Sequence, residues 1–324
     1  MLLLDRARSL WGPWWPLPAG LPLAYVLAVA AAGDFRPEHG VIVLVSGALA
    51  YGSERTKRFF QYAVPYLMVA IGYDAVRYVR PLMVGPDDVL GCGLRSAELA
   101  LFRVAPNVTY QDWFALHHHP AFDLLFAVPY LIFAYVPFAY ALYLYFVDRP
   151  RMQHFLWAFA VGNFISFTTW MLVPAAPPWY LRAHGCTIDL SAVPSPAALS
   201  RVDTLLGMTY FHDFYSRASS VFGALPSMHC AFPLIGLLTA WRAAGWRTRP
   251  IHIAYTVVMA TAAVYLDHHW VLDVLAGWLV ALIAVFLAAW GLRRYGELQR
   301  REPVAEDEGP GETETLEPRE DPAA

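Results

Sequence analysis

The feature that most constrains this chain is a series of about eight apolar stretches separated by polar connections. They cover residues 17–32, 38–51, 59–76, 122–147, 154–174, 228–244, 250–266 and 270–292. A helix needs about 20 apolar residues to cross a bilayer, and several of these stretches approach that length. The chain is also 58% hydrophobic and only 15% charged, which is more apolar than a soluble domain requires. The sequence therefore predicts an all-α, polytopic membrane helix bundle.

Basic residues recur in every second connection between these stretches. They are Arg6 and Arg8, then Arg55, Lys57 and Arg58, then Arg149 and Arg151, then Arg242, Arg247 and Arg249, and finally Arg293, Arg294, Arg300 and Arg301. Basic loops tend to stay in the cytoplasm, so both termini are expected there. The long connections at residues 77–121 and 175–225 then share the outer face with the turn at 267–269. The Ala-, Arg- and Pro-rich composition favours a bacterial cytoplasmic membrane, with this face toward the periplasm.

The apolar pattern stops near the C-terminus. Residues 302–324 carry nine carboxylates against Arg319 and are rich in proline, which is typical of disorder. We therefore expect N-terminal spans at 1–58, a larger membrane domain at 59–296 and an acidic cytoplasmic tail at 297–324. Cys92 and Cys186 both fall in outer connections, where an oxidising compartment would allow a disulfide and a reducing one would leave two thiols.

The stretch ALPSMHCAF, residues 224–232, opens the sixth apolar run with a proline and a histidine. Proline suits the first position of a helix, so a helix beginning at Pro226 leaves the N–H groups around Ser227 and His229 without intrahelical partners. Such a helix start attracts anions, and a histidine there can exchange a proton with a bound phosphate. An interfacial histidine without chemistry is the alternative for this motif alone.

The stretch YLDHHWVLDVLAG, residues 265–277, opens the eighth apolar run. His269 and Asp273 are four residues apart, which places both on one face of a helix. The carboxylate can hold the proton of one ring nitrogen and leave the lone pair of the other free to act as a nucleophile. A structural hydrogen-bonded pair is the alternative.

The charge pattern brings both motifs to the outer face, together with the end of the third run, YDAVRYVRP at residues 73–81. That end carries Asp74, Arg77 and Arg80, and guanidinium groups match the geometry of a phosphate. These groups together indicate phosphoryl transfer without a metal or other cofactor.

In the mechanism that this pattern favours, His269 attacks the phosphorus and Asp273 stabilises the imidazolium. His229 protonates the departing alkoxide and then deprotonates the acceptor. Water as the acceptor makes the protein a phosphatase, whereas an alcohol makes it a transferase.

At these residues the chain resembles the type 2 phosphatidic acid phosphatase superfamily, whose second and third motifs correspond to residues 226–229 and 269–273. Within it, the chain is similar to the fungal inositol phosphorylceramide synthases and their bacterial relatives. The stretches that carry this likeness are YDAVR (73–77), HPAFDLLFAVPY (119–130), APPWY (176–180), FGALPSMH (222–229) and DHHWVLD (267–273). The resemblance covers roughly residues 60–290 and implies a six-helix membrane core, preceded here by two further spans. It also implies transfer of phosphoinositol from a glycerophospholipid to a ceramide-like alcohol.

The chain departs from the superfamily at two phosphate-binding cations. Tyr73 replaces the lysine of the first motif, and Ala263 replaces the arginine that precedes the third-motif histidine. Other cations must substitute for them, and the candidates are Arg77, Arg80, Arg182 and Arg217. The remaining candidates for the substrate pocket are Ser227, Asp74, His119, Asp123, Trp179, Tyr180 and His268.

Two other functions stay open on the sequence. A lipid phosphate or polyprenyl diphosphate phosphatase would use the same catalytic residues, and a lipid-binding or transport protein would keep the fold without the chemistry. Under the preferred interpretation the partners are a phospholipid donor and a lipid alcohol acceptor, with no nucleic acid. The sequence does not indicate whether an accessory subunit exists.

Overall fold

The computed structural model describes residues 2–301, so residues 302–324 of the predicted acidic tail lie outside the described residues. Within residues 2–301 the chain consists of helices and connections and contains no strand, which confirms the predicted all-α class. The α-helices are α1 (Leu2–Trp11), α2 (Leu17–Ala31), α3 (Pro37–Gly52), α4 (Glu54–Met83), α5 (Cys92–Phe102), α6 (Tyr110–Leu116), α7 (Pro120–Ile132), α8 (Tyr135–Val147), α9 (Arg149–Leu172), α10 (Pro178–His184), α11 (Ser200–Leu206), α12 (Tyr210–Tyr215), α13 (Met228–Ala240), α14 (Arg249–Tyr265) and α15 (Val271–Arg301).

All eight apolar stretches are helical. Helices α9 and α15 are each long and apolar enough to cross a membrane. Among the described residues this number rises to four if the α1–α2 and α7–α8 pairs, bent by 94° and 54°, each count as one span. The stretch 122–147, expected as one helix, breaks between α7 and α8 because Pro137 has no N–H to bond back to the preceding turn.

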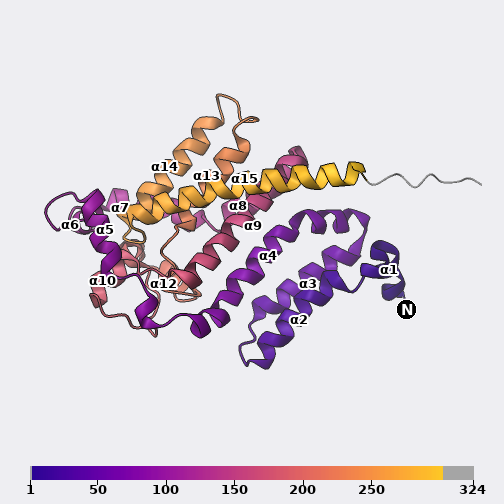
Figure 1. The fold of residues 1–324 in the computed structure, drawn as a ribbon, viewed down its shortest axis with the longest axis horizontal. Helices are drawn as coiled ribbons and strands as arrows, with labels where there is room; N and C mark the ends of the chain where they lie inside the picture. The colour runs from indigo at the N-terminus through magenta and orange to yellow at the C-terminus, as the bar shows by residue number, and fades with distance from the viewer. Residues whose placement is uncertain (1, 302–324) are drawn as a thin grey trace, which may run out of the picture.

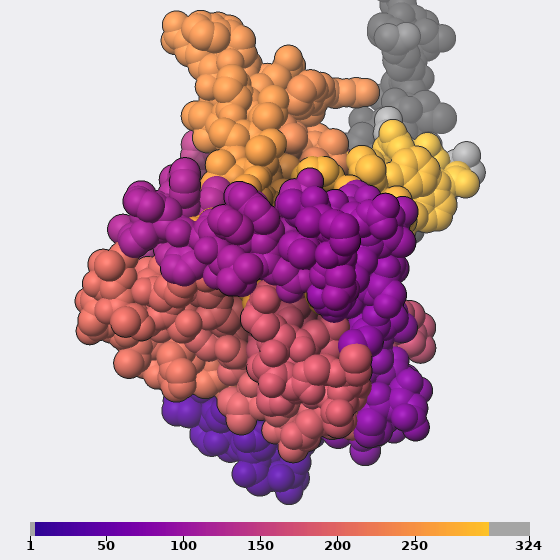
Figure 2. All heavy atoms as spheres, turned by 90° about the vertical axis from the view of Figure 1, so that its left-hand side faces the viewer, coloured from indigo at the N-terminus to yellow at the C-terminus, as the bar shows by residue number. Residues whose placement is uncertain are grey.

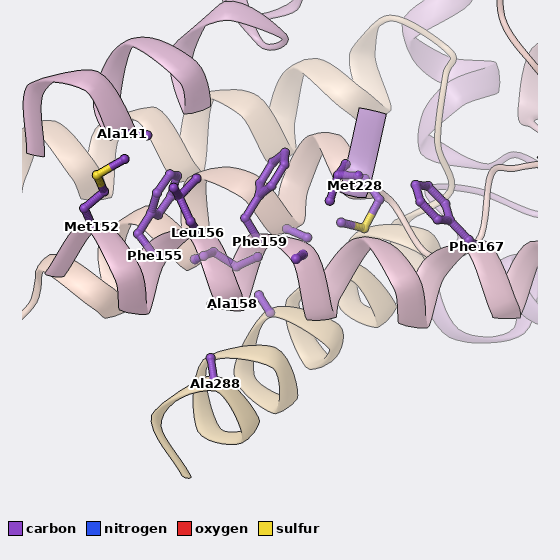
Figure 3. Close-up of a cluster of buried hydrophobic side chains, with 14 of the residues drawn as sticks. Ala141, Met152, Phe155, Leu156, Ala158, Phe159, Phe167, Met228 and Ala288 are labelled. Atoms are coloured by element: carbon purple, nitrogen blue, oxygen red, sulfur yellow. The ribbon is translucent and has the colours of Figure 1, made fainter. Parts of the chain in front are cut away.

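Helix α9 lies at the centre of the bundle and packs against α4, α8, α13 and α15. Figure 3 shows its aromatic and aliphatic side chains interdigitating with those of the neighbouring helices. The labelled members of this core are Met152, Phe155, Leu156, Ala158, Phe159 and Phe167 from α9, with Ala141, Met228 and Ala288 from α8, α13 and α15. Because Met228 is the first residue of α13, core packing also fixes the start of that helix.

Of the N-terminal helices, α3 packs against α4, and α2 packs against α3 (Figure 1). Asp74 of α4 joins all three, because its carboxylate bonds to Tyr25 of α2 at 2.6 Å and to His39 of α3 at 2.9 Å and pairs with Arg36. The predicted domain boundary after residue 58 lies within α4.

The two long connections gather at one end of the bundle. Figure 2 looks onto that end and shows it covered by the segment that contains α5 and α6 and by the segment that contains α10 to α12. Ala175 N–H donates to the Phe222 carbonyl and Leu90 N–H donates to the Pro174 carbonyl, which ties the connections together. A disulfide between Cys92 and Cys186 joins them covalently. The pairing that the sequence left open is therefore present.

Candidate active site

Two histidines from separate motifs meet at this covered end. His229 lies in the first turn of α13. His269 lies in the short turn between α14 and α15, so the prediction that it shares a helix with Asp273 is wrong, because α15 begins only at Val271. Nδ1 of His229 is 3.1 Å from Nε2 of His269. Helix α13 begins at Met228, two residues after the predicted start at Pro226, with Ser227 as its N-cap. The structure thus brings together two side chains that are 40 residues apart in the chain.

The surroundings of His269 determine which of its ring nitrogens carries the proton. Nδ1 is 3.0 Å from the carbonyl oxygen of Ala224 and 3.5 Å from Oδ2 of Asp273. Since a carbonyl only accepts, Nδ1 carries the hydrogen, and the lone pair of Nε2 faces His229. The sequence pointed to Asp273 as the orienting group, whereas the shorter contact is to a backbone oxygen. A carbonyl carries no sequence signal, so this partner was missed.

A backbone hydrogen bond also joins the His229 motif to the His269 motif. Ser227 N–H donates to the carbonyl of Asp273 at 3.0 Å. A Cβ atom at Gly277, one turn further along α15, would overlap the Ser227 carbonyl oxygen. Only glycine therefore lets α15 lie this close to the start of α13.

Buried side chains from the first long connection hold the turn that carries His269. Glu98 of α5 accepts hydrogen bonds from the N–H groups of Val271 at 2.8 Å and Leu272 at 3.2 Å. Gln111 of α6 donates to the His269 carbonyl at 2.9 Å. Burial raises the pKa of Glu98, and the two N–H groups oppose that rise. Sequence reasoning missed both residues, although a glutamate inside the apolar stretch AELALF was a usable signal.

Helices α13 and α15 differ in whether the backbone N–H groups of their first turns have hydrogen-bond partners. Asp273 and Glu98 occupy the first N–H groups of α15, since Trp270 N–H donates to Asp273 at 2.9 Å. Among the described residues no partner accepts from the first N–H groups of α13. The fully buried Ser227 hydroxyl at that helix start faces only the weakly donating thiol of Cys230. An anion would thus be received at α13 and not at α15.

Of the candidate phosphate-binding cations, Arg77 and Arg80 of α4 have no carboxylate partner in the described part of the chain. Arg77 donates to the carbonyl of Arg217 at 2.9 Å. The Arg80 guanidinium lies 5.2 Å from the centre of the Phe222 ring, and its Nε and one terminal nitrogen have no hydrogen-bond partner. Both arginines border the segment that leads into the His229 motif.

Arg182 of α10 is placed differently. It forms two hydrogen bonds of 3.0 Å to the carboxylate of Asp267 and a third contact of 3.2 Å to Asp112. Hydrogen bonding to Asp267 raises the pKa of the Arg182 guanidinium. The Arg182 guanidinium therefore stabilises the turn before His269 and has few N–H groups left to bind a ligand.

A second ion pair, also made with a buried carboxylate, lies in the same region. Asp123 of α7 accepts from Arg201 at 2.6 Å and from the Tyr265 hydroxyl at 3.0 Å. Arg201 was not among the residues singled out in the sequence. His119 caps the start of α7, where its Nδ1 accepts from Ala121 N–H at 3.2 Å.

The remaining sequence candidates lie in the second connection and in the turn before α15. Tyr180 is fully buried and donates to the Thr187 carbonyl at 3.0 Å, while Trp179 N–H donates to the Asp267 carbonyl at 3.2 Å. His268 bonds to the Pro196 carbonyl at 3.1 Å. Asp74 belongs to the contact among α2, α3 and α4 and not to this cluster.

Comparisons with known proteins give one consistent result. The sequence model of the PAP2 superfamily matches residues 98–287. The chain is 32% identical to the phosphoinositol dihydroceramide synthase of Bacteroides thetaiotaomicron, over 83% of this chain and 90% of that protein. It is 31% identical to the inositol phosphorylceramide synthase of Candida albicans, over 49% of this chain and 34% of that protein. It is 30% identical to the inositol phosphorylceramide synthase catalytic subunit of Saccharomyces cerevisiae, over 68% of this chain and 54% of that protein. No solved structure matches significantly.

Proposed function

The chain belongs to the PAP2 superfamily, and we propose that it is a membrane lipid phosphotransferase that moves phosphoinositol from a glycerophospholipid to a ceramide-like alcohol. The observation that carries this proposal is the 3.1 Å approach of His229 Nδ1 to His269 Nε2 beside an unoccupied helix start. The names of the bacterial and fungal relatives support phosphoinositol as the transferred group.

In the first half-reaction, Nε2 of His269 forms a bond to phosphorus as the bond from phosphorus to the diacylglycerol oxygen breaks. The bound phosphodiester separates the two rings, and its negative charge favours a protonated His229. The His229 imidazolium gives its proton to the departing oxygen, which leaves as diacylglycerol. The imidazolium ring of the phosphohistidine carries a positive charge, and the Ala224 carbonyl and Asp273 stabilise its Nδ1–H.

In the second half-reaction the acceptor hydroxyl bonds to phosphorus and the bond to His269 breaks. His229, now neutral, takes the hydroxyl proton. His269 is 5% exposed, so water has little access to the intermediate, and this burial supports transfer to an alcohol over hydrolysis.

The phosphate oxygens are received by the free N–H groups of α13, the Ser227 hydroxyl, Arg77 and Arg80. The lack of carboxylate partners supports these two arginines as substitutes for the missing motif cations. The alternating basic connections support placing this end at the outer face of a bacterial membrane, with both termini in the cytoplasm.

The test is a reaction of the purified full-length protein with headgroup-labelled phosphatidylinositol and a ceramide in mixed micelles, with products identified by mass spectrometry. The expected products are diacylglycerol and an inositol-bearing sphingolipid, and both should be lost in His269→Asn. Release of free inositol phosphate without a new lipid would assign a hydrolase instead. Binding of donor lipid without turnover would assign a lipid-binding protein.

A further inference from the structure

Two tyrosines that lie against His268, next to the catalytic histidines, have no part in the mechanism above. Tyr130 of α7 stacks on His229 with ring centres 4.5 Å apart and on His268 with ring centres 5.0 Å apart. Tyr215 of α12 stacks on His268 at 4.7 Å. The two tyrosines come from elements that are far apart in the sequence, yet both lie against the same histidine.

The hydroxyl groups of both tyrosines are buried and have no hydrogen-bond partner in the described part of the chain. The ring of Tyr130 is only 2% exposed, so water does not compensate. A buried hydroxyl without a partner costs about 1–3 kcal/mol, and phenylalanine would avoid that cost with the same shape. Two such groups beside one histidine indicate that they bind a ligand.

The chemical groups around His268 suit the hydroxyl groups of a ligand better than they suit a phosphate. A phenol both donates and accepts, and the Nε2–H of His268 is given to the Pro196 carbonyl, so its Nδ1 is an acceptor. Burial lowers the pKa of His268 to about 3, which keeps the ring neutral at physiological pH. A neutral acceptor between two phenols gives no cation for a phosphate, but it matches the alternating donor and acceptor capacity of a polyol.

We propose that Tyr130, Tyr215 and His268 form a subsite that binds the ring hydroxyls of a polyol headgroup during phosphoryl transfer. This inference rests on the function proposed above and names the residues that select the donor.

The position of the subsite favours the headgroup over the lipid acceptor. In the proposed reaction the headgroup stays on phosphorus through both half-reactions, whereas diacylglycerol leaves and the acceptor enters from the bilayer. Tyr130 belongs to a cluster of buried side chains that includes Leu199 just before α11, Phe211 of α12 and Met259 of α14. A buried position one ring away from His229 suits the part that is retained.

The experiment uses the full-length protein and the variants Tyr130→Phe and Tyr215→Phe with a series of phosphatidylinositols that each lack one ring hydroxyl. We expect each variant to lower kcat/KM for intact phosphatidylinositol by about 10- to 100-fold, the effect of losing hydrogen bonds to a buried group. With the donor that lacks the contacted hydroxyl, the variant and the wild type should be equal, because that contact is already gone. Tyr140→Phe is the matched control, since Tyr140 packs on Phe155 of the core and is expected to behave as wild type.

Variants that lose the same factor with every donor would overturn the subsite while leaving the proposed function intact. A loss that couples to hydroxyls of the ceramide would also overturn it, in favour of an acceptor site. If the wild type transfers no phosphoinositol, both proposals fall. Thermal unfolding with inositol 1-phosphate measures binding even in variants without turnover. The ligand should raise the Tm of the wild type, and it should raise the Tm of each variant by less. Equal shifts would contradict the proposal.

Discussion

Arg182 and Arg201 each pair with a buried carboxylate, Asp267 and Asp123. Arg77 and Arg80, at the same end of the bundle, pair with no carboxylate among residues 2–301. The paired arginines lie on the second long connection and hold the catalytic turn and α7 in place. The unpaired arginines lie on α4, beside the segment that leads to His229. A guanidinium already committed to two oxygens has little capacity for a ligand, so the difference separates scaffold cations from candidate phosphate-binding cations.

The largest effect expected from this comparison is on turnover. The double variant Arg77→Gln, Arg80→Gln should lower kcat/KM by about 10²–10⁴-fold, because two charge-assisted hydrogen bonds of about 1.5–3 kcal/mol each are lost. Its thermal unfolding should stay close to that of the wild type, since neither side chain pairs with a carboxylate in the described part of the chain. Only the Arg77 hydrogen bond to a carbonyl and the Arg80 contact with Phe222 are lost. Arg103→Gln, an exposed arginine of the first long connection, is the control. A double variant that unfolds early but turns over normally per folded molecule would reverse the assignment.

The next effect is on stability. Arg182→Gln removes the hydrogen-bonded cation from the Asp267 carboxylate. Because the Arg182 side chain is 39% exposed and water partly screens this pair, the free energy of unfolding should fall by about 1.5–3 kcal/mol. Adding Asp267→Asn should restore much of that loss, because the uncompensated charge is then removed. Thermal unfolding of the three variants in detergent measures both steps. An Arg182→Gln protein that is as stable as the wild type and impaired only in KM for phosphatidylinositol would move Arg182 into the group of substrate-binding cations.

Glu98 sharpens the comparison, because it is a buried carboxylate that is compensated by backbone N–H groups and not by an arginine. Glu98→Gln replaces one accepting oxygen with an amide NH₂ that faces an N–H group. We expect a loss of about 1–2 kcal/mol in stability and a fall in kcat with little change in KM, since the turn that carries His269 loosens. Glu98→Asp, which keeps both oxygens, should recover part of kcat. An unchanged kcat in Glu98→Gln would show that this carboxylate does not position His269.

Several parts of this architecture were predictable because they depend on local pattern. The apolar stretches became helices at the expected places, and the motifs around His229 and His269 lie together because the topology brings alternate helix ends to one face. The break near Pro137 was missed, since a proline close to a helix start is compatible with either a continuous or a broken span. The Cys92–Cys186 pairing stayed open because it depends on how two separate loops fold together.

The site partners that escaped prediction act through the backbone or across long sequence separations. The Ala224 carbonyl reaches His269 from 45 residues away, and Gln111 reaches it from 158 residues away. Neither contact leaves a pattern in the residue types. The pairing of Arg182 with Asp267 is also a contact between residues far apart in the sequence. This pairing is what distinguishes Arg182 from the unpaired Arg77 and Arg80.

The smallest effect concerns Asp112, the partly exposed carboxylate that bridges Arg182 and Arg95. Burial opposes its ionisation, but hydrogen bonds from Thr109 and Arg95 outweigh burial and lower the pKa of Asp112. A lowered folded pKa means that the carboxylate contributes stability fully above its unfolded value of about 3.9 and loses that contribution as the pH falls through the lower folded value. Because water screens this pair, Asp112→Asn should cost only about 1 kcal/mol or less at pH 7. Unfolding measured at pH 7, 5 and 3 should show the same difference between wild type and variant at the first two values and a smaller one at the third. A difference in free energy of unfolding that stays constant down to pH 3 would mean that the hydrogen-bond geometry of Asp112, and not its charge, supports the outer connections. The contrast between paired and unpaired arginines would then rest on Asp267 and Asp123 alone.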